Sequence, residues 1–388
     1  MLRFLTAGES HGPALVAILE GIPAGLPLTA EMIDHELERR QRGFGAGGRM
    51  KIEQDRVRIL GGVLEGQTTG APIALLVENR DHSHWKGKAI PAMTAPRPGH
   101  ADLSGAIKFG YKDLRPALER ASARETTMRV AVGAICKQLL GQFGIRIGGY
   151  VSAIGGIQGR FDGIPLEVRL EAAEQNNVRC PDAEIAEKMR ARIRQIMQEK
   201  DTLGGMIEVV ALGVPPGLGS FSQWDRRLEA RIAQAVLSVP AIKGVEIGEA
   251  FENAHLRGTQ AQDAILLREG RLVRGSNRAG GIEGGISNGE AILVRAAMKP
   301  IATTLLPQTT VDLARGNEAL TRYERSDFCP VPRAVPILEA MLAFVLAEAL
   351  LEKLGGDSLA EMQPRFAALR QATLADLALD DQPHVFWP

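Results

Sequence analysis

The chain has 388 residues, of which 45% are hydrophobic and 24% charged, so it can form a large core beneath a solvated surface. Its 46 basic side chains equal its 46 acidic ones and only 4% of its residues are aromatic, which argues against a nucleic-acid-binding protein that depends on a basic excess and on stacking rings. The three cysteines lie far apart with no Cys-x-x-Cys pair, so we expect neither a disulfide scaffold nor a thiolate zinc site, and we expect a cytoplasmic protein.

Apolar residues at helical spacing predict five helices. The first is expected to start after Thr29 and to end near Arg39-Arg40. Ser122-Ala-Arg-Glu125 has the capping-box pattern, so a second helix is expected to start there. Its apolar positions are Met128, Val132, Ile135, Leu139 and Phe143. A third helix begins near Asp182 and a fourth follows Ser222.

The fifth predicted helix, from about Val335 to Leu354, is apolar nearly all round and stops at Gly355-Gly356. A helix without a polar face must be covered on more than one side. Glu339 and Glu348 stand within this segment, where carboxylates would be costly in lipid. We therefore expect a buried core helix and no membrane span.

Short apolar and β-branched segments predict strands at residues 57–60, 73–77, 207–211, 245–247 and 291–296. Strands and helices mix without a regular βαβ alternation, and no long polar linker divides the chain. These features predict an α+β fold in layers, with one domain over residues 1–356 and a C-terminal extension at 357–388. The similar Ser/Arg-rich entries to the helices at Ser122 and Val335 suggest an internal pseudo-repeat.

Glycine-rich loops are candidates for a close approach between backbone and ligand. Gly43-x-Gly45-x-x-Gly48 has the spacing of a dinucleotide fingerprint, but it follows a predicted helix, which argues against a Rossmann site. No P-loop sequence occurs. His82-Ser-His84 could bind a metal, but we favour a solvated loop there and predict no metal site.

Two histidines stand in short Gly- or Pro-framed segments beside a carboxylate. They are His11 in Gly8-Glu-Ser-His11-Gly12 and His100 in Pro96-Arg-Pro-Gly-His100-Ala-Asp102. Histidine titrates near neutral pH and a neighbouring charge tunes it, so both are candidates for proton transfer. The alternative is that each ring only hydrogen-bonds a turn.

Arginines collect in the same kind of loop. The set comprises Arg39, Arg40, Arg42, Arg49, Arg97, Arg115, Arg120, Arg124, Arg322, Arg325 and Arg333. Any one of them could form an ordinary surface ion pair. Together, in a chain without net charge, they predict a focused site for a small ligand with several negative charges, because guanidinium groups match phosphate and carboxylate oxygens.

Several long motifs together resemble the chorismate synthase family, from Met1 to about Gly356. They are Gly8-Glu-Ser-His-Gly12, Arg40-x-x-Gly43-x-Gly45, Pro96-Arg-Pro-Gly-His-Ala-Asp102, Arg120-Ala-Ser-Ala-Arg-Glu-Thr126, Asn277-Arg-Ala-Gly-Gly281 and Arg325-Ser-Asp327. The resemblance implies a lyase that performs the seventh step of the shikimate pathway, the 1,4-trans elimination of phosphate from 5-enolpyruvylshikimate 3-phosphate to give chorismate. It also implies reduced FMN as cofactor without net redox change, a β-α-β sandwich with helices between two antiparallel sheets, and a homotetramer.

The resemblance further implies residue roles. His11 would be the acid that assists phosphate departure, His100 the partner of the reduced flavin, and Asp327 the carboxylate that helps proton removal from the substrate. The implied flavin contacts are Arg120, Ala121, Ser122, Gln260, Ala261, Gly284, Lys299, Pro300, Ile301, Ala302, Thr303 and Arg325. Arg40 matches a position assigned to NADP(H), and Arg49, Arg124 and Arg333 are candidates for binding substrate oxygens.

One departure from the family pattern concerns NADP(H). The family often has a second arginine in the glycine loop, where this chain has Ala46, and this weakens the case for NADP(H) binding. No separate flavin reductase domain is visible in the sequence, so we expect an external flavin reductase to supply FMNH2. Two rival interpretations stay open. One is a flavin or NADP oxidoreductase with net redox turnover, and the other is an RNA-binding module built on Gly/Arg loops.

Overall fold

Two antiparallel sheets form the framework of the computed structural model, which describes residues 1–47, 54–324, 326–377 and 379–386. The first sheet has four strands in the order β1-β2-β6-β3. Its strands are β1 (Arg3–Ala7), β2 (Ala14–Glu20), β6 (Ile73–Glu78) and β3 (Val57–Gly61). Ile73, Leu75 and Val77 alternate along β6 and are buried on its inner face, as the period of a strand requires.

The second sheet has five strands in the order β10-β15-β9-β7-β8. They are β10 (Ile242–Ile247), β15 (Ile292–Met298), β9 (Gly205–Leu212), β7 (Arg146–Ile154) and β8 (Ile157–Gln158). All five predicted strands are confirmed to within a few residues, but β1, β2, β7 and β8 of these two sheets were not predicted. Four small hairpins complete the strands: β4 (Val63–Leu64) with β5 (Gln67–Thr68), β11 (Ile265–Arg268) with β12 (Arg271–Arg274), β13 (Ile282–Glu283) with β14 (Ile286–Ser287), and β16 (Thr309–Asp312) with β17 (Asn317–Leu320).

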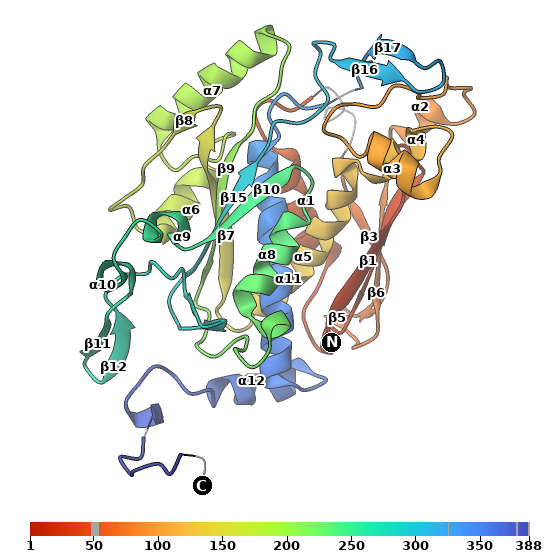
Figure 1. Ribbon diagram of the computed structural model, residues 1–388. Coiled ribbons are helices and arrows are strands. Elements are labelled where there is room, and N and C mark those ends of the chain that lie inside the picture. The colour runs from red at the N-terminus through yellow and green to blue at the C-terminus, as the bar shows by residue number, and fades with distance from the viewer. Residues whose placement is uncertain (48–53, 325, 378, 387–388) are drawn as a thin grey trace.

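Three helices lie between the two sheets (Figure 1). They are α1 (Ala30–Gln41), α5 (Thr126–Gly141) and α11 (Val331–Leu354). On one side, α5 packs against β1, β2 and β6, and on the other α11 packs against β7 and β9. The two helices also pack against each other, and a Cβ atom on Gly133 would lie only 2.2 Å from the Cβ atom of Ala340, so glycine permits this close crossing.

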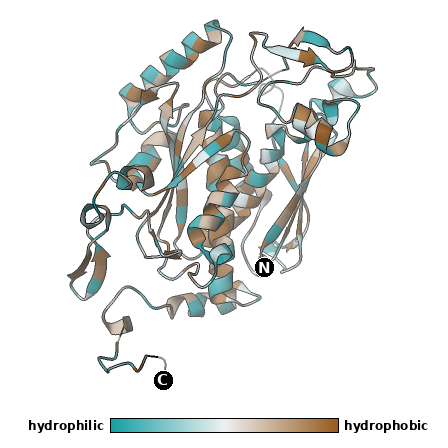
Figure 2. Cartoon of the chain, in the orientation of Figure 1, coloured by the Kyte–Doolittle hydropathy of each residue, from teal (hydrophilic) through white to brown (hydrophobic). Residues whose placement is uncertain are grey.

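Helix α11 is long and apolar enough to cross a membrane by length and composition, but 83% of its most apolar window is buried inside the protein. The prediction of a buried core helix is thus confirmed. Hydrophobic residues predominate along the central helices (Figure 2). The mixed helix-and-sheet class that the sequence predicted is confirmed as α+β.

The remaining helices lie around this core, and one of them, α8 (Leu228–Leu237), packs against α11 and β10. They are α2 (His82–Trp85), α3 (Asp102–Phe109), α4 (Arg115–Arg120), α6 (Leu166–Glu174), α7 (Ala183–Gln198), α8 (Leu228–Leu237), α9 (Ala250–Asn253), α10 (Gly258–Ala261) and α12 (Leu359–Ala367), with the 3-10 turns η2 (Ala123–Glu125), η3 (Trp224–Arg226) and η4 (Ala375–Leu377). Asp182 caps α7 by accepting a hydrogen bond from the Ile185 amide, as the sequence predicted. In the C-terminal segment, Leu359 and Met362 of α12 are buried in the core.

Helix boundaries differ from prediction at four places. Helix α8 starts at Leu228, beyond the 3-10 turn η3, and not directly after Ser222. The predicted capping box at Ser122 does not form. The Ser122 hydroxyl caps the 3-10 turn η2, and α5 starts only at Thr126. The Glu125 carboxylate instead accepts hydrogen bonds from Thr6 and Arg129. Helix α11 starts four residues earlier than expected, at Val331, since Pro332 in its first turn suits a helix start. Phe143 lies beyond the end of α5.

Candidate active site

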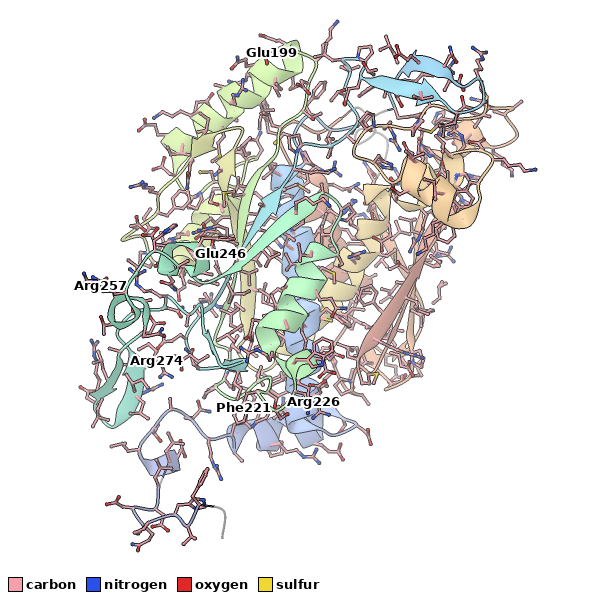
Figure 3. All side chains as sticks on the ribbon, viewed as in Figure 1. Glu199, Phe221, Arg226, Glu246, Arg257 and Arg274 are labelled. Atoms are coloured by element: carbon pink, nitrogen blue, oxygen red, sulfur yellow. The ribbon has the colours of Figure 1, made fainter. Side chains whose placement is uncertain are left out.

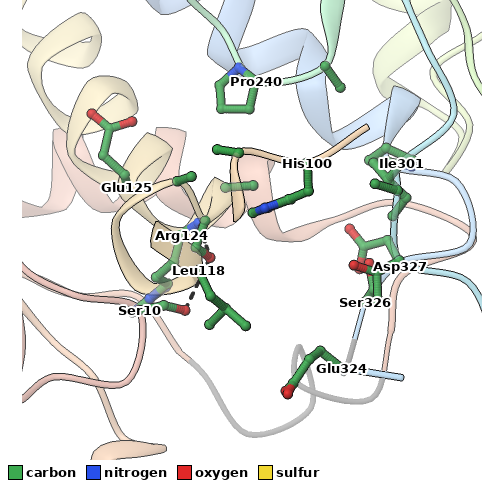
Figure 4. Close-up of a pocket in the computed structure, with 18 of the residues that line it drawn as sticks. Ser10, His100, Leu118, Arg124, Glu125, Pro240, Ile301, Glu324, Ser326 and Asp327 are labelled. Atoms are coloured by element: carbon green, nitrogen blue, oxygen red, sulfur yellow. Dashed lines mark hydrogen bonds between the residues drawn. The ribbon is translucent and has the colours of Figure 1, made fainter. Parts of the chain in front are cut away.

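A cavity of about 770 Å³ opens where the ends of four helices meet. Its walls include Arg40 near the end of α1, Ser122–Glu125 before α5, Leu237–Lys243 after α8, and Pro330 and Arg333 at the start of α11. Figure 4 shows His100, Arg124 and Asp327 around this space, on segments that are far apart in the sequence. The volume lies within the range usual for small-molecule sites, roughly 300–1,000 Å³.

The charge on the cavity wall is strongly positive although the chain as a whole is neutral. Among the described lining residues are eight arginine or lysine side chains and three carboxylates. The N-termini of α5 and α11 also lie at this end of the molecule, and their dipoles favour anions. The arrangement suits a small ligand with several negative charges.

His11 is held by Glu119, which lies at the C-terminal end of α4. Its Nδ1 is 2.8 Å from Glu119 Oε1, and its backbone N–H donates to Oε2 at 2.8 Å. The ring also stacks at a tilt on Trp85, with 4.6 Å between centroids. Burial disfavours the charged form of Glu119, but the hydrogen bonds from the His11 ring and amide outweigh it and lower the pKa of Glu119.

His100 belongs to a second histidine–carboxylate pair. Its Nδ1 is 2.6 Å from Oδ1 of Asp102, a fully buried carboxylate. Arg97 donates from Nε to Oδ2 of the same carboxylate at 2.8 Å and from Nη2 to Oδ1 at 2.9 Å. Burial would raise the pKa of Asp102, but the hydrogen bonds from Arg97 and His100 lower it well below its usual range. Asp102 therefore stays ionised and fixes His100 at the cavity wall.

Asp327 lines the cavity, and its carboxylate accepts hydrogen bonds from two donors. The Gly47 amide donates to Oδ1 at 2.8 Å, and Arg333 Nη1 donates to Oδ2 at 2.5 Å. A Cβ atom on Gly47 would lie 2.2 Å from the carbonyl oxygen of Ser326, so this residue must be small for the two segments to touch. The carboxylate is thus oriented by the glycine loop and by the first turn of α11.

Arg40 and Arg124 form a buried cationic pair beside Asp55. Arg124 Nη1 donates to Asp55 Oδ1 at 2.5 Å, and Arg40 Nη1 lies 3.5 Å from Oδ2. Burial, reinforced by the charges of Arg333 and Arg124, lowers the pKa of Arg40 to about 9, although Asp55 and Asp327 act in the opposite direction. A bound anion would relieve this crowding of positive charge.

Most of the other predicted site residues also line the cavity. They are Arg120, Ala121, Ser122, Lys299, Ile301, Ala302 and Thr303. Lys299 Nζ donates to the Gly99 carbonyl at 2.7 Å, which ties the segment after β15 to the His100 loop. Thr303 Oγ1 accepts from Arg97 Nη1 at 3.1 Å. Pro300 lies in the same segment but is not among the lining residues.

Three predicted flavin contacts lie elsewhere. Gln260 and Ala261 belong to α10, and Gly284 joins β13 to β14. Figure 3 labels Arg257, the N-cap of α10, at the end of the molecule away from α3 and α4. Within the described parts of the chain, none of the three lines the cavity, and their role stays a prediction. Arg49 and Arg325 lie outside the described residues.

Some of the arginines expected at an anion site have other roles. Arg39 points into the core, where it pairs with Glu36, Glu174 and the fully buried Glu339. The prediction that Arg39 belongs to the anion site is therefore wrong. Arg42 and Arg115 do not line the large cavity either, as judged from the described residues.

The histidine pair at 82–84 also differs from expectation. These residues form the short helix α2 rather than a loop. His82 Nδ1 lies 2.9 Å from the His11 carbonyl oxygen, and His84 faces Asp81. In the described ranges, no group of three or more His, Cys, Asp or Glu side chains is placed to hold a metal ion. The segment therefore supports the backbone of His11.

Sequence reasoning missed several residues of the site. Arg97 was predicted only as an anion-site arginine and Asp102 only as the carboxylate next to His100, so the bond between these two residues was missed. The wall formed by residues 237–243 was not foreseen. Glu119 was also missed, because it lies 108 residues from His11. Its position directly before the Arg120 motif was the signal that could have drawn attention to it.

A strongly cationic cavity at converging helix ends, with two histidines on its wall that are each held by a carboxylate behind them, defines an enzyme site for a small polyanion. A chorismate synthase from Rubrobacter xylanophilus is 52% identical over 371 residues, covering 94% of this chain and 95% of that protein. One from Aquifex aeolicus is 53% identical over 385 residues, covering 94% and 96%. A chorismate synthase crystal structure superposes with a TM-score of 0.78 at 47% identity and covers 94% of this chain and 96% of that one.

The family model for chorismate synthase matches residues 2–351, and the chain belongs to the chorismate synthase family. It is an enzyme of the carbon–oxygen lyase class, in the shikimate pathway.

Proposed function

We propose that the enzyme uses reduced FMN to eliminate phosphate from 5-enolpyruvylshikimate 3-phosphate in a 1,4-trans sense, giving chorismate without net redox change. The observation that carries this proposal is the convergence of His11, His100 and Asp327 on one cationic cavity. The substrate has one phosphate and two carboxylates, and the eight cationic side chains of the wall match these charges.

The residues of the chain have distinct tasks in this proposal. His11 donates a proton to the departing phosphate, as a general acid does. Asp327, oriented by Gly47 and Arg333, helps accept the proton lost from the substrate ring in this proposal. Arg40, Arg124 and Arg333 lie together beside the cavity and neutralise substrate oxygens.

The cavity suits a flavin as well as the substrate. Val239, Pro240 and Ile301 provide apolar surface, and the backbone of residues 120–122 provides polar groups. His100, fixed by Asp102, is a donor for the anionic edge of the ring system. Reduced FMN, when bound, would supply an electron for cleavage of the C–O bond and would take it back on loss of the C–H bond, so that no net redox change results. Lys299 and Thr303, whose side chains bond the His100 loop, would hold its polar groups.

Further properties follow from family membership and belong to the proposal. We infer a homotetramer in the cytoplasm that receives FMNH2 from a separate reductase. The helices packed between the two sheets are taken as the β-α-β sandwich of the family, a single domain to residue 356. We propose no NADP(H) site, because Ala46 stands where the family often has a second arginine in the glycine loop.

The test is an anaerobic assay with reduced FMN and 5-enolpyruvylshikimate 3-phosphate that follows phosphate and chorismate together. We expect equal amounts of both products with only catalytic FMNH2. Net NADPH or FMNH2 oxidation in step with product would favour an oxidoreductase instead. His11→Ala should keep FMN affinity but lose turnover roughly a hundredfold or more. Near-normal turnover of this variant would remove His11 from the mechanism.

A further inference from the structure

We propose that Glu119 is the positioning residue of His11: it fixes the orientation of the imidazole, keeps a proton on Nδ1 and leaves Nε2 to act on the ligand. This inference rests on the proposed function, because it assigns to Glu119 the task of preparing His11 as the acid. Glu119 itself does not line the large cavity, so it acts through His11 rather than on the substrate.

Both carboxylate oxygens of Glu119 hydrogen-bond to His11. Oε1 is 2.8 Å from the ring Nδ1 of His11, and Oε2 accepts the His11 backbone N–H at 2.8 Å. A carboxylate held at two points on one residue fixes both the main chain and the ring torsion of that residue. The Ser10 amide donates to the Glu119 carbonyl at 3.2 Å, which ties the segment before β2 to the end of α4.

The surroundings of His11 leave the ring little freedom. Its side chain is 16% exposed and that of Glu119 is 13% exposed. Trp85 packs against the ring at a tilt, and His82 Nδ1 lies 2.9 Å from the His11 carbonyl oxygen. Glu119 is therefore the partner that decides which ring nitrogen carries the proton, and no other described side chain hydrogen-bonds that ring.

The position of the pair between two cavities supports the same assignment. His11 lines the large cavity and also a smaller one of about 310 Å³, whereas Glu119 lines only the smaller one. The carboxylate thus approaches the ring from the side away from the other candidate site residues, His100 and Asp327. This is the arrangement of an orienting carboxylate behind a catalytic histidine.

The proton balance of the step is simple. Before the reaction the His11 ring is an imidazolium with protons on Nδ1 and Nε2, and the Glu119 carboxylate balances its charge. As the substrate C–O bond breaks, the Nε2–H bond breaks and an O–H bond forms on the leaving phosphate. The ring becomes the neutral Nδ1–H tautomer, still bonded to Glu119, and solvent restores the Nε2 proton before the next turnover.

Glu119→Gln tests the inference, because it keeps the shape of the side chain and removes the charge. We expect kcat to fall at least about tenfold while KM for 5-enolpyruvylshikimate 3-phosphate stays nearly constant. Glu119→Asp, which keeps the charge, should restore part of kcat. Glu208→Gln is the matched control, since Glu208 is a similarly buried carboxylate that bonds Tyr150 and Arg295 in the sheet. It should leave kcat unchanged.

A ¹⁵N NMR spectrum of histidine-labelled protein gives a readout independent of turnover, with His11→Ala assigning the resonance. At high pH, where the ring is neutral, wild-type His11 should show a protonated Nδ1, and Glu119→Gln should shift the population toward the Nε2–H tautomer. An unchanged kcat and tautomer in Glu119→Gln would overturn the inference, as would an equal kcat loss in Glu208→Gln. An inactive wild-type protein with the expected Nδ1–H signal would instead refute the proposed function alone.

Discussion

Gly47→Ala is predicted to impair catalysis in a protein that still folds. Gly47 donates its amide to Asp327 and packs against the backbone of Ser326. The added Cβ atom would meet the Ser326 carbonyl oxygen at 2.2 Å and the Ser326 carbonyl carbon at 2.9 Å. Backbone atoms cannot swing aside as the end of a flexible side chain can, so the segment that carries Asp327 must move.

The size of the movement follows from the contact distance. Since Cβ atoms essentially never approach closer than 3.0 Å, the two segments must separate by about 0.8 Å. A misplacement of about 1 Å near reacting groups can cost roughly a hundredfold in rate. We therefore expect kcat to fall about tenfold to a hundredfold. The cost in stability should stay within the roughly 1–3 kcal/mol typical of overpacking.

The assay is anaerobic turnover with reduced FMN, combined with urea unfolding to separate catalysis from stability. Gly141→Ala is the matched control, because a Cβ atom there would meet no atom within 4 Å and the residue ends α5. It should retain both activity and stability. Full activity in Gly47→Ala would show that the position of Asp327 does not matter to the reaction.

Three further predictions concern the site and the core. Asp327→Asn should keep affinity for FMN and substrate but slow turnover at least about tenfold, because the amide is a far weaker proton acceptor; an intact rate would rule out its role. Asp102 has a lowered pKa in the folded protein, so its contribution to stability is complete above the ordinary carboxyl pKa near 3.9 and is lost as the pH falls below it. Urea unfolding should therefore show a steeper loss of stability between about pH 5 and 3 for the wild type than for Asp102→Asn, and parallel curves would contradict this. Gly133→Ala should destabilise the protein by about 1–3 kcal/mol in urea unfolding, because the new Cβ atom would lie 2.2 Å from the Cβ atom of Ala340. The cost of this clash exceeds the gain in helix propensity of about 1 kcal/mol. A stabilised variant would mean that α5 and α11 can separate freely.

The sequence predicted the core elements best where their periodicity is strong. Helix α11 is apolar on all sides because it is covered by α5 and by the five-stranded sheet, and this pattern is visible without a structure. Strand β2 was missed because its apolar residues do not alternate cleanly: Val16 and Ile18 lie on the outer face beside buried Leu15 and Ala17. The start of α5 was misplaced because the side chain of Glu125 reaches Thr6, a tertiary contact that local patterns cannot reveal.

The candidate site was predictable in its residues more than in its geometry. His11, His100 and Asp327 were identified from motifs, and all three line one cavity. The partners that hold them come from distant segments: Glu119 for His11, and Gly47 and Arg333 for Asp327. Arg39 was assigned to the site although it lies in the core. Its carboxylate partner Glu339 lies 300 residues away in α11, and only the fold brings the two together.

A crystal structure of the enzyme with FMN and 5-enolpyruvylshikimate 3-phosphate would test the central claim most directly. We predict both ligands side by side in the 770 Å³ cavity, with the phosphate against His11 and the flavin between His100 and Asp327. Ligands bound on another face, or a phosphate out of reach of His11, would contradict the account.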